Sequence, residues 1–250
     1  MTTMRLKRPI RVEDGDGPPR YPVKEVLATI RERIYRGDKY ECSCCGKSFK
    51  LLLYSPIMAA LCPYCLSVER YRLLCRYLRD RTDFGSGPMR VLDIAPMWCF
   101  QEFCRSFENV DYVSIDIASP LAMRHMDIRD LEFRDNLFDC IICYHVLEHI
   151  DDEQKALSEL YRVLKPGSWA IIQVPIILED TVERSELTEE EADEMLKFDD
   201  HLRGYGKDYG QRLQGAGFRV EVDDFVKKLS MREIIRYGLD ISEDIYLSRK

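Results

Sequence analysis

The sequence contains no long uninterrupted run of apolar residues. No segment approaches the roughly 20 residues that a helix needs to span a bilayer, so we expect no transmembrane helix. The basic start, Met1–Arg11, has no apolar core segment, which argues against a secretory signal. We therefore expect a cytoplasmic protein. In that reducing compartment its 10 cysteines should bind metal or stay as buried thiols rather than form disulfides.

A strong excess of positive charge is also missing. The formal net charge of -7 argues against a general nucleic-acid binder. The charge is unevenly spread, because residues 1–82 hold 17 Lys and Arg against 9 Asp and Glu, whereas residues 83–250 hold 20 against 35. This split predicts two units with different surfaces, and the basic front third leaves an anionic partner open.

Two CxxC pairs form the strongest local pattern. The cysteines are Cys42, Cys45, Cys62 and Cys65. The 16 residues between the pairs are typical of a four-cysteine zinc site, and Gly46 permits a tight turn after the first pair. Four thiolates fill a tetrahedron, so such a zinc would be structural. A ligand set that includes Cys44, or a group of free thiols, remains an alternative.

An apolar segment and a basic one surround the second pair. Lys50–Tyr54 predicts a strand beside the metal, and the apolar spacing within Ser67–Leu78 predicts a helix. Five arginines lie close together at positions 70, 72, 76, 79 and 81. They form either a face that pairs with the acidic remainder of the chain or a patch that binds an anionic substrate.

Beyond an expected linker at Asp83–Pro88, strand and helix patterns alternate. Strands are predicted at Met89–Ala95, Tyr112–Ile117, Phe138–Tyr144 and Trp169–Val174. Helices are predicted at Trp98–Phe107 and Asp152–Leu164. This alternation predicts a doubly wound, Rossmann-like α/β fold, in which ligands bind beyond the carboxyl ends of the parallel strands.

Acidic residues stand where those strand ends should be. Asp93 lies in the first strand, Asp116 ends the second one 23 residues later, and Asp127 ends a short third strand. The spacing of the first two suits hydrogen bonds to ribose hydroxyls. Any one of them could instead be a helix cap or a turn residue.

Four stretches carry a resemblance to a known family. They are Val91–Pro96, Tyr112–Asp116, Phe138–Ile150 and Glu159–Gly167. They resemble the class I S-adenosylmethionine-dependent methyltransferases of the type 11 group over about residues 89–250, and CPYCLSVERYRLL resembles the zinc-binding head of a subset of these enzymes.

The resemblance implies a mostly parallel seven-stranded sheet preceded by a small zinc-ribbon-like module. The expected divisions are an extension and helix at 1–39, a zinc-binding module with the arginine-rich helix at 40–82, and the methyltransferase domain at 83–250. An insertion is expected at about 176–205, where such folds often carry a lid or an acceptor-binding segment.

The resemblance also implies the roles of single residues. The implied cofactor contacts are Asp93, Ala95 and Pro96 at the methionine part, Asp116 and Ile117 at the ribose, Asp127 and Ile128 at the adenine, and Tyr144 at the reactive methyl group. The sequence departs from the family at the first loop, which is usually rich in glycine. Here Ala95, Pro96 and Met97 restrict the approach of the backbone to a ligand.

Histidines are the candidate catalytic groups. His145 follows the fourth strand and is either a general base or a polar turn residue, while His149 reads as structural. His201, with Arg203 and Tyr205, is either an acceptor contact or part of an exposed segment.

Three functions compete. The first is O- or N-methylation of a small molecule or saccharide with S-adenosylmethionine. The second is methylation of RNA or protein, with the zinc head and the arginine helix gripping the substrate. The third is a non-catalytic interaction module with a degenerate cofactor site. A dehydrogenase is disfavoured because the sequence has no GxGxxG loop.

Overall fold

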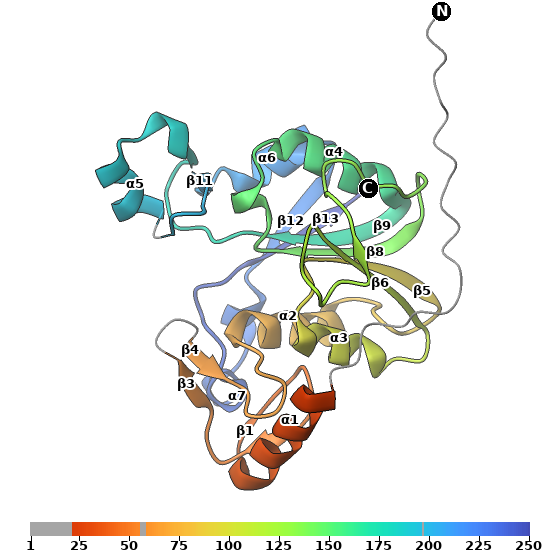
Figure 1. Ribbon diagram of the computed structural model, residues 1–250, viewed down its shortest axis with the longest axis vertical. Helices are drawn as coiled ribbons and strands as arrows, with labels where there is room; N and C mark the ends of the chain where they lie inside the picture. The colour runs from red at the N-terminus through yellow and green to blue at the C-terminus, as the bar shows by residue number, and fades with distance from the viewer. Residues whose placement is uncertain (1–21, 56–58, 197) are drawn as a thin grey trace, which may run out of the picture.

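The computed structural model describes residues 22–55, 59–196 and 198–250 (Figure 1). A seven-stranded sheet in the order β12-β13-β9-β8-β5-β6-β7 forms its centre, and β13 runs antiparallel to both neighbours. The strands are β5 (Met89–Ile94), β6 (Val110–Asp116), β7 (Arg124–His125), β8 (Phe138–Tyr144), β9 (Leu164–Gln173), β12 (Arg219–Asp223) and β13 (Ile245–Arg249). The predicted Rossmann-like, mostly parallel sheet is confirmed. The segment Met1–Arg11 lies outside the described residues.

Helices cover both faces of the sheet. The helices are α1 (Pro22–Tyr35), α2 (Glu69–Arg81), α3 (Trp98–Arg105), α4 (Glu153–Val163), α5 (Glu189–Leu196), α6 (Tyr209–Gly215) and α7 (Met231–Tyr237). In Figure 1, α2 and α3 lie on one side of the sheet, and α4 and α6 on the other. Successive strand residues alternate between two cores, so that Val91 joins the first and Leu92 the second. Burial on both faces explains why these strands read as continuous apolar runs.

The predicted elements differ from the structure mainly at their ends. The strand Phe138–Tyr144 has the predicted bounds, whereas β9 begins at Leu164, five residues before its expected start. Helix α4 begins after Asp152, whose Oδ1 accepts a hydrogen bond from the Lys155 amide at 3.0 Å. This N-cap satisfies one of the amides that a helix start leaves without a partner.

The front part of the chain contains two small antiparallel pairs. Their strands are β1 (Arg36–Glu41) with β2 (Ser48–Phe49), and β3 (Leu53–Ser55) with β4 (Ala59–Leu61). The strand expected at Lys50–Tyr54 is wrong in its extent, because the strand begins only at Leu53. Leu51 is 39% exposed and Tyr54 is 84% exposed, so this apolar run does not pack as a whole against the head.

The head and the sheet share one hydrophobic core. Cys42 and Cys65 are buried in the same cluster as Leu74 of α2 and Val91 of β5. The expected linker at Asp83–Pro88 is instead a packed turn, since Phe84 is buried and its ring centroid lies 5.2 Å from that of Phe107. The division at residue 83 therefore falls inside one packed body.

The arginine-rich helix is α2, and most of its arginines bind the protein itself. Arg72 is fully buried. Arg76 pairs with Asp80 of the same helix at 2.6 Å, and Arg81 pairs with Asp223 of β12 at 3.4 Å. These contacts support an internal pairing face over an anion-binding patch.

The segment at about 176–205 forms a lobe beside the sheet (Figure 1). It contains β10 (Val182–Glu183), the 3-10 helix η2 (Arg184–Glu186), α5 and β11 (Arg203–Gly204). Two further 3-10 helices are η1 (Leu147–His149), directly after β8, and η3 (Phe225–Lys228). Among the described residues, no helix combines the length and the hydropathy required to cross a membrane.

Candidate functional site

A cavity of about 460 Å³ opens at the carboxyl ends of the parallel strands. The chain runs outward from β5 to β6 and β7 and then returns to β8, which pairs with the other edge of β5. Such a reversal of strand order leaves a crevice in which open α/β sheets bind ligands. The lining residues are Ile94, Ala95, Asp116, Ile117, Met126, Asp127, Ile128, Arg129, His145, Val146, His149, Ile150, Asp151 and Leu202.

The structure brings six of the ten predicted cofactor and catalytic residues together in this lining. They are Ala95, Asp116, Ile117, Asp127, Ile128 and His145. The other four, Asp93, Pro96, Tyr144 and His201, do not line the cavity. Residues that the sequence did not single out include Met126 and Arg129, in the loop after β7, and Leu202, which comes from the insertion.

Two strands end in a left-handed backbone conformation beside the cavity. Ala95, after β5, has φ 55°, and His145, after β8, has φ 57°. This region costs a residue with a side chain about 1–2 kcal/mol, so both positions carry backbone strain. Such strain is often found at ligand sites.

Asp116 ends β6 at the mouth of the cavity. Its Oδ1 accepts hydrogen bonds from the amides of Ala118 at 2.8 Å and Ser119 at 2.7 Å. The carboxylate is therefore both a turn residue and a fixed acceptor in the cavity wall. A second oxygen on the same group suits the hydroxyl groups of a ribose.

The prediction that Asp127 ends a short strand is wrong, because β7 ends at His125, two residues earlier. Arg129 Nη2 contacts Oδ2 of Asp127 at 2.6 Å, and the same guanidinium pairs with Asp151. The hydrogen bonds from Arg129 lower the pKa of Asp127. Arg129 thus joins the two loops that border this end of the cavity.

Asp93 and Tyr144 lie behind the cavity because of strand periodicity. Asp93 is 3% exposed and accepts a hydrogen bond from the Tyr112 hydroxyl at 2.5 Å. Burial raises the pKa of Asp93 to about 8. The Tyr144 ring packs against Tyr71 of α2 at 5.4 Å, and its hydroxyl donates to Glu243 Oε2 at 3.3 Å. Neither Asp93 nor Tyr144 therefore lines the cavity in which cofactor contacts were expected.

His145 lies between two carboxyl groups. Its Nδ1 is 3.3 Å from Oε1 of Glu148, and its Nε2 is 3.9 Å from Oε1 of Glu243. The Nε2 atom is buried and has no hydrogen-bond partner within the described ranges. Burial raises the pKa of Glu243. Sequence reasoning missed both glutamates, because Glu148 reads as one polar residue in a short helical stretch and Glu243 is distant in sequence.

The predicted companions of His201 are structural. Arg203 is 4% exposed and donates from Nη1 to the carbonyl oxygens of Leu147 and Ile150, each at 2.7 Å. Tyr205 is buried, and its hydroxyl donates to Oε1 of Glu153 at 2.7 Å. These bonds fasten the insertion to the loop after β8.

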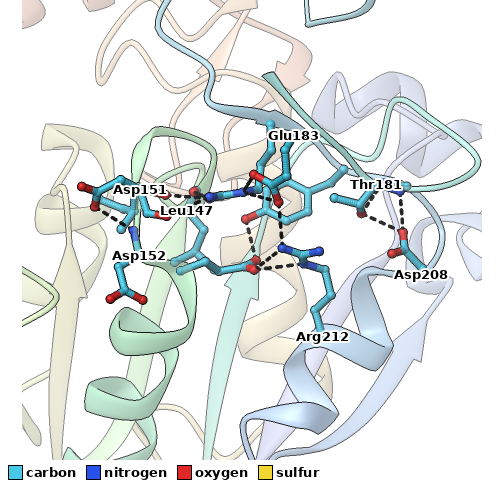
Figure 2. A network of polar contacts seen from close by, with 12 residues as sticks. Leu147, Asp151, Asp152, Thr181, Glu183, Asp208 and Arg212 are labelled. Atoms are coloured by element: carbon cyan, nitrogen blue, oxygen red, sulfur yellow. Dashed lines mark hydrogen bonds and ion pairs between the residues drawn. The ribbon is translucent and has the colours of Figure 1, made fainter. Parts of the chain in front are cut away.

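Figure 2 shows the same network around Glu183 and Arg212. Arg212 of α6 pairs with Oε1 of Glu183 at 3.1 Å and with the buried Glu153 at 2.6 Å. Next to this network, His201 is 7% exposed, and burial lowers the pKa of its imidazole. His201 therefore stands behind the cavity wall and not at its surface.

The four predicted metal ligands lie together in the head. The Sγ atoms of Cys42 and Cys65 are 3.6 Å apart, those of Cys45 and Cys62 are 3.7 Å apart, and all four lie within 4.8 Å of one another. Cys44 instead donates from Sγ to the carbonyl oxygen of Tyr71 at 3.3 Å.

The two CxxC turns are built alike. Gly46 follows the first pair with φ 69°, and Leu66 follows the second with φ 57°. The Gly46 amide donates to the Cys42 carbonyl at 2.7 Å, as the Leu66 amide does to the Cys62 carbonyl at 3.0 Å. Gly46 thus permits the tight turn that the sequence had predicted, and Leu66 adopts the same conformation with a side chain.

Comparisons with known proteins point in one direction. Residues 83–172 match a family described as a methyltransferase domain. The chain is 48% identical over 64 residues to the ubiquinone/menaquinone biosynthesis C-methyltransferase UbiE of Klebsiella pneumoniae, which covers 26% of this chain and 21% of that protein. The UbiE of Haemophilus ducreyi is 45% identical over 42 residues, which cover 17% of this chain and 16% of that protein.

The chain therefore spans about a fifth of the length of the curated relatives that it matches. Among solved structures, an S-adenosylmethionine-dependent methyltransferase of Archaeoglobus fulgidus superposes with a TM-score of 0.50 at 18% identity, covering 71% of this chain and 93% of that one. At this identity the likeness shows the fold. Residues 83–172 are thus similar to a methyltransferase domain, and the sheet around them has the Rossmann-like fold of that solved structure.

Proposed function

We propose that the protein transfers a methyl group from S-adenosylmethionine to a small-molecule acceptor. The observation that carries this proposal is the cavity at the strand reversal between β5 and β8, with Asp116 in its wall, inside the segment that is similar to methyltransferase domains. Its volume of about 460 Å³ lies in the range of small-molecule sites. This volume and the Asp116 carboxylate in the wall support the fit of an adenosyl group.

The chain's own residues suggest how the cofactor is held. Asp116 would accept hydrogen bonds from the ribose hydroxyls, and Ile128 would pack against the adenine. Ala95, which lines the cavity in a left-handed conformation, would place the backbone after β5 beside the methionine part. When bound, the cofactor supplies an activated methyl group, so positioning accounts for much of the rate.

His145 is the proposed general base. Glu148 would hold the Nδ1 proton of the imidazole, which leaves the lone pair of Nε2 without a partner. This nitrogen is buried on the side of Glu243, so it would take a proton only from an acceptor that reaches in between these two side chains. The position of His145 at the end of β8, in the cavity lining, supports this role. Glu148 acts through His145 and is a positioning residue.

A small acceptor fits the structure better than a macromolecule. Most of the arginines that were expected to grip RNA or protein bind carbonyl or carboxylate groups of this chain, as Arg72, Arg76 and Arg81 do. The curated relatives are named as C-methyltransferases of ubiquinone and menaquinone biosynthesis. That name is compatible with a small acceptor but does not fix the atom methylated, which is carbon, nitrogen or oxygen.

The head would hold a structural zinc ion. Zinc–sulfur bonds of about 2.3 Å in a tetrahedron place the sulfur atoms about 3.8 Å apart. The separations of 3.6 Å for Cys42 and Cys65 and 3.7 Å for Cys45 and Cys62 are close to that value. The Ser67 hydroxyl lies 3.1 Å from Sγ of Cys42 and 3.3 Å from Sγ of Cys65, where it would stabilise both thiolates.

Calorimetric titration with S-adenosylhomocysteine tests the cofactor assignment. We expect binding to the unaltered chain, and at least tenfold weaker binding to Asp116→Ala. The matched control is Asp111→Ala, at the other end of the same strand, where the side chain is half exposed and pairs with Arg90. The absence of binding to the folded, zinc-loaded chain would favour a non-catalytic module.

A second measurement separates the classes of acceptor. The protein is incubated with S-adenosylmethionine carrying a labelled methyl group and a cell extract, which is then divided by size. We expect the label in the small-molecule fraction. Label in RNA or protein that depends on the added chain would contradict the proposed acceptor class.

A further inference from the structure

A second cluster of possible metal ligands lies at the cavity wall, far from the four cysteines in sequence. Glu148 and His149 belong to η1, directly after β8, and His201 belongs to the insertion. One ligand atom from each of the three lies within 4.8 Å of the others. Two separate segments of the fold therefore bring a carboxylate and two imidazoles to one place.

Two of these side chains are buried with unused bonding capacity. Glu148 is 1% exposed, and its Oε2 has no hydrogen-bond partner among the residues that the structure describes. His201 is 7% exposed, and the same holds for its Nδ1. A buried polar atom without a partner is costly, so a shared partner that satisfies both groups would stabilise this arrangement.

The third side chain, His149, has a hydrogen-bond partner on the ring nitrogen that would not bind the metal, as metal-binding histidines commonly do. Nδ1 of His149 lies 3.2 Å from the carbonyl oxygen of Asp200 and 3.3 Å from its Oδ2. A proton held on Nδ1 by these oxygens leaves the lone pair of the other ring nitrogen for a ligand. The role of Asp200 would be to fix that tautomer.

We propose that Glu148, His149 and His201 bind a divalent transition-metal ion of the zinc class. Two imidazole nitrogens and one carboxylate oxygen suit such an ion, whereas magnesium and calcium prefer all-oxygen sites. The Oε1 atom of Glu148 faces His145, so the unpartnered Oε2 is the oxygen that would reach the metal.

The ion would link the insertion to the segment that follows the carboxyl end of β8. The two segments already meet, because the Leu202 amide donates to the carbonyl oxygen of Glu148 at 2.7 Å. Leu202 and His149 both line the cavity, so the metal would hold one wall of it in place. Three protein ligands leave a coordination position open. An open position that faces the methyl acceptor rests on the proposed function. The binding of the ion does not depend on that function.

Cobalt(II) titration of the full chain, with zinc already in the four-cysteine site, tests the proposal. We expect one further equivalent of cobalt with weak visible absorption bands and without the strong near-ultraviolet band of a cobalt–thiolate bond. His201→Phe and His149→Ala should each abolish this equivalent. His149 is partly exposed, so its variant should fold even where the buried His201 variant does not.

His125→Ala is the matched control, since His125 is an exposed histidine on β7, outside the cluster. It should bind cobalt as the unaltered chain does. No further cobalt at millimolar concentration, or equal binding by all three histidine variants, would overturn the proposal. S-adenosylhomocysteine titration of the same samples separates the two claims, because Asp116→Ala should lose that ligand and keep the cobalt.

Discussion

Arg72 of α2 donates a hydrogen bond from Nη2 to the carbonyl oxygen of Gly238 at 2.6 Å, at the C-terminal end of α7. The same guanidinium reaches the carbonyl oxygens of Tyr237 at 2.7 Å, Ala60 at 2.9 Å and Ser67 at 2.5 Å. A helix end leaves carbonyls without partners, and this one buried cation satisfies two of them. Arg72 thereby joins the head, the arginine-rich helix and α7.

Replacing Arg72 by lysine should therefore destabilise the whole protein. A lysine ammonium is a compact charge that cannot reproduce the planar fork of the guanidinium, so buried carbonyls would lose their donors. We expect a loss of roughly 3 kcal/mol in the free energy of unfolding. Urea denaturation measures it, with Arg81→Lys as the control, because Arg81 is half exposed. Equal effects in the two variants would contradict this role of Arg72.

Removing one cysteine ligand should release the metal, whereas removing the spare cysteine should not. We expect Cys62→Ser to lose zinc and Cys44→Ser to keep it, as measured by metal content after dialysis. Because the head and one face of the sheet share a core, the loss of zinc should lower the stability of the whole chain in one transition. Zinc retained in Cys62→Ser, or lost only in Cys44→Ser, would show that the ligand set is wrong.

The buried carboxyl group of Asp93 predicts a pH dependence of stability. Its folded-state pKa of about 8 lies above the ordinary 3.8, so Asp93 favours folding while it is protonated. This contribution is fully present below about pH 4 and is lost as the pH rises towards 8, at most ~1.4 kcal/mol per pH unit.

Asp93→Asn should remove this loss. We expect its stability, relative to the unaltered chain, to rise by a few kcal/mol (~1.4 per pH unit) between pH 4 and 8. Asp111→Asn, at a half-exposed position, should show no such trend. Denaturant titrations across this range give both curves, and parallel curves for Asp93→Asn and the unaltered chain would refute the prediction.

His145 should affect the chemical step more than cofactor binding. We expect His145→Gln to bind S-adenosylhomocysteine with nearly unchanged affinity while methyl transfer falls by ~10²–10⁴-fold, the usual contribution of a general base. Single-turnover transfer to the small-molecule fraction measures the rate. An unchanged rate would mean that the acceptor loses its proton without His145.

The fold could be predicted because its signals are local. Strands buried on both faces read as apolar runs, and Asp152 marks the start of α4 as a cap. The ends of β5 and β6 could be placed in the same way, which is why Ala95 and Asp116 could be expected at the mouth of the cavity that they line. Alternation along β5 also determines that Asp93 shares a face with Val91, but the helices that cover this face come from distant segments.

The rest of the site depends on contacts between remote parts of the chain. Glu148 gains significance only because His201, more than fifty residues later, folds back beside it. Arg203 looked like a substrate contact because its carbonyl partners, at Leu147 and Ile150, cannot be inferred from the sequence around it. Burial of a charged residue is a tertiary property, and a single sequence read by itself gives no direct sign of it.

The most direct test of the account is a crystal structure of the zinc-loaded chain with S-adenosylhomocysteine. We predict electron density for the adenosyl group in the cavity between β5 and β8, with the ribose hydroxyls on Asp116 and the sulfur atom facing His145. Density at another place, or side chains that fill this crevice in the crystal, would contradict the proposal that the protein is a methyltransferase.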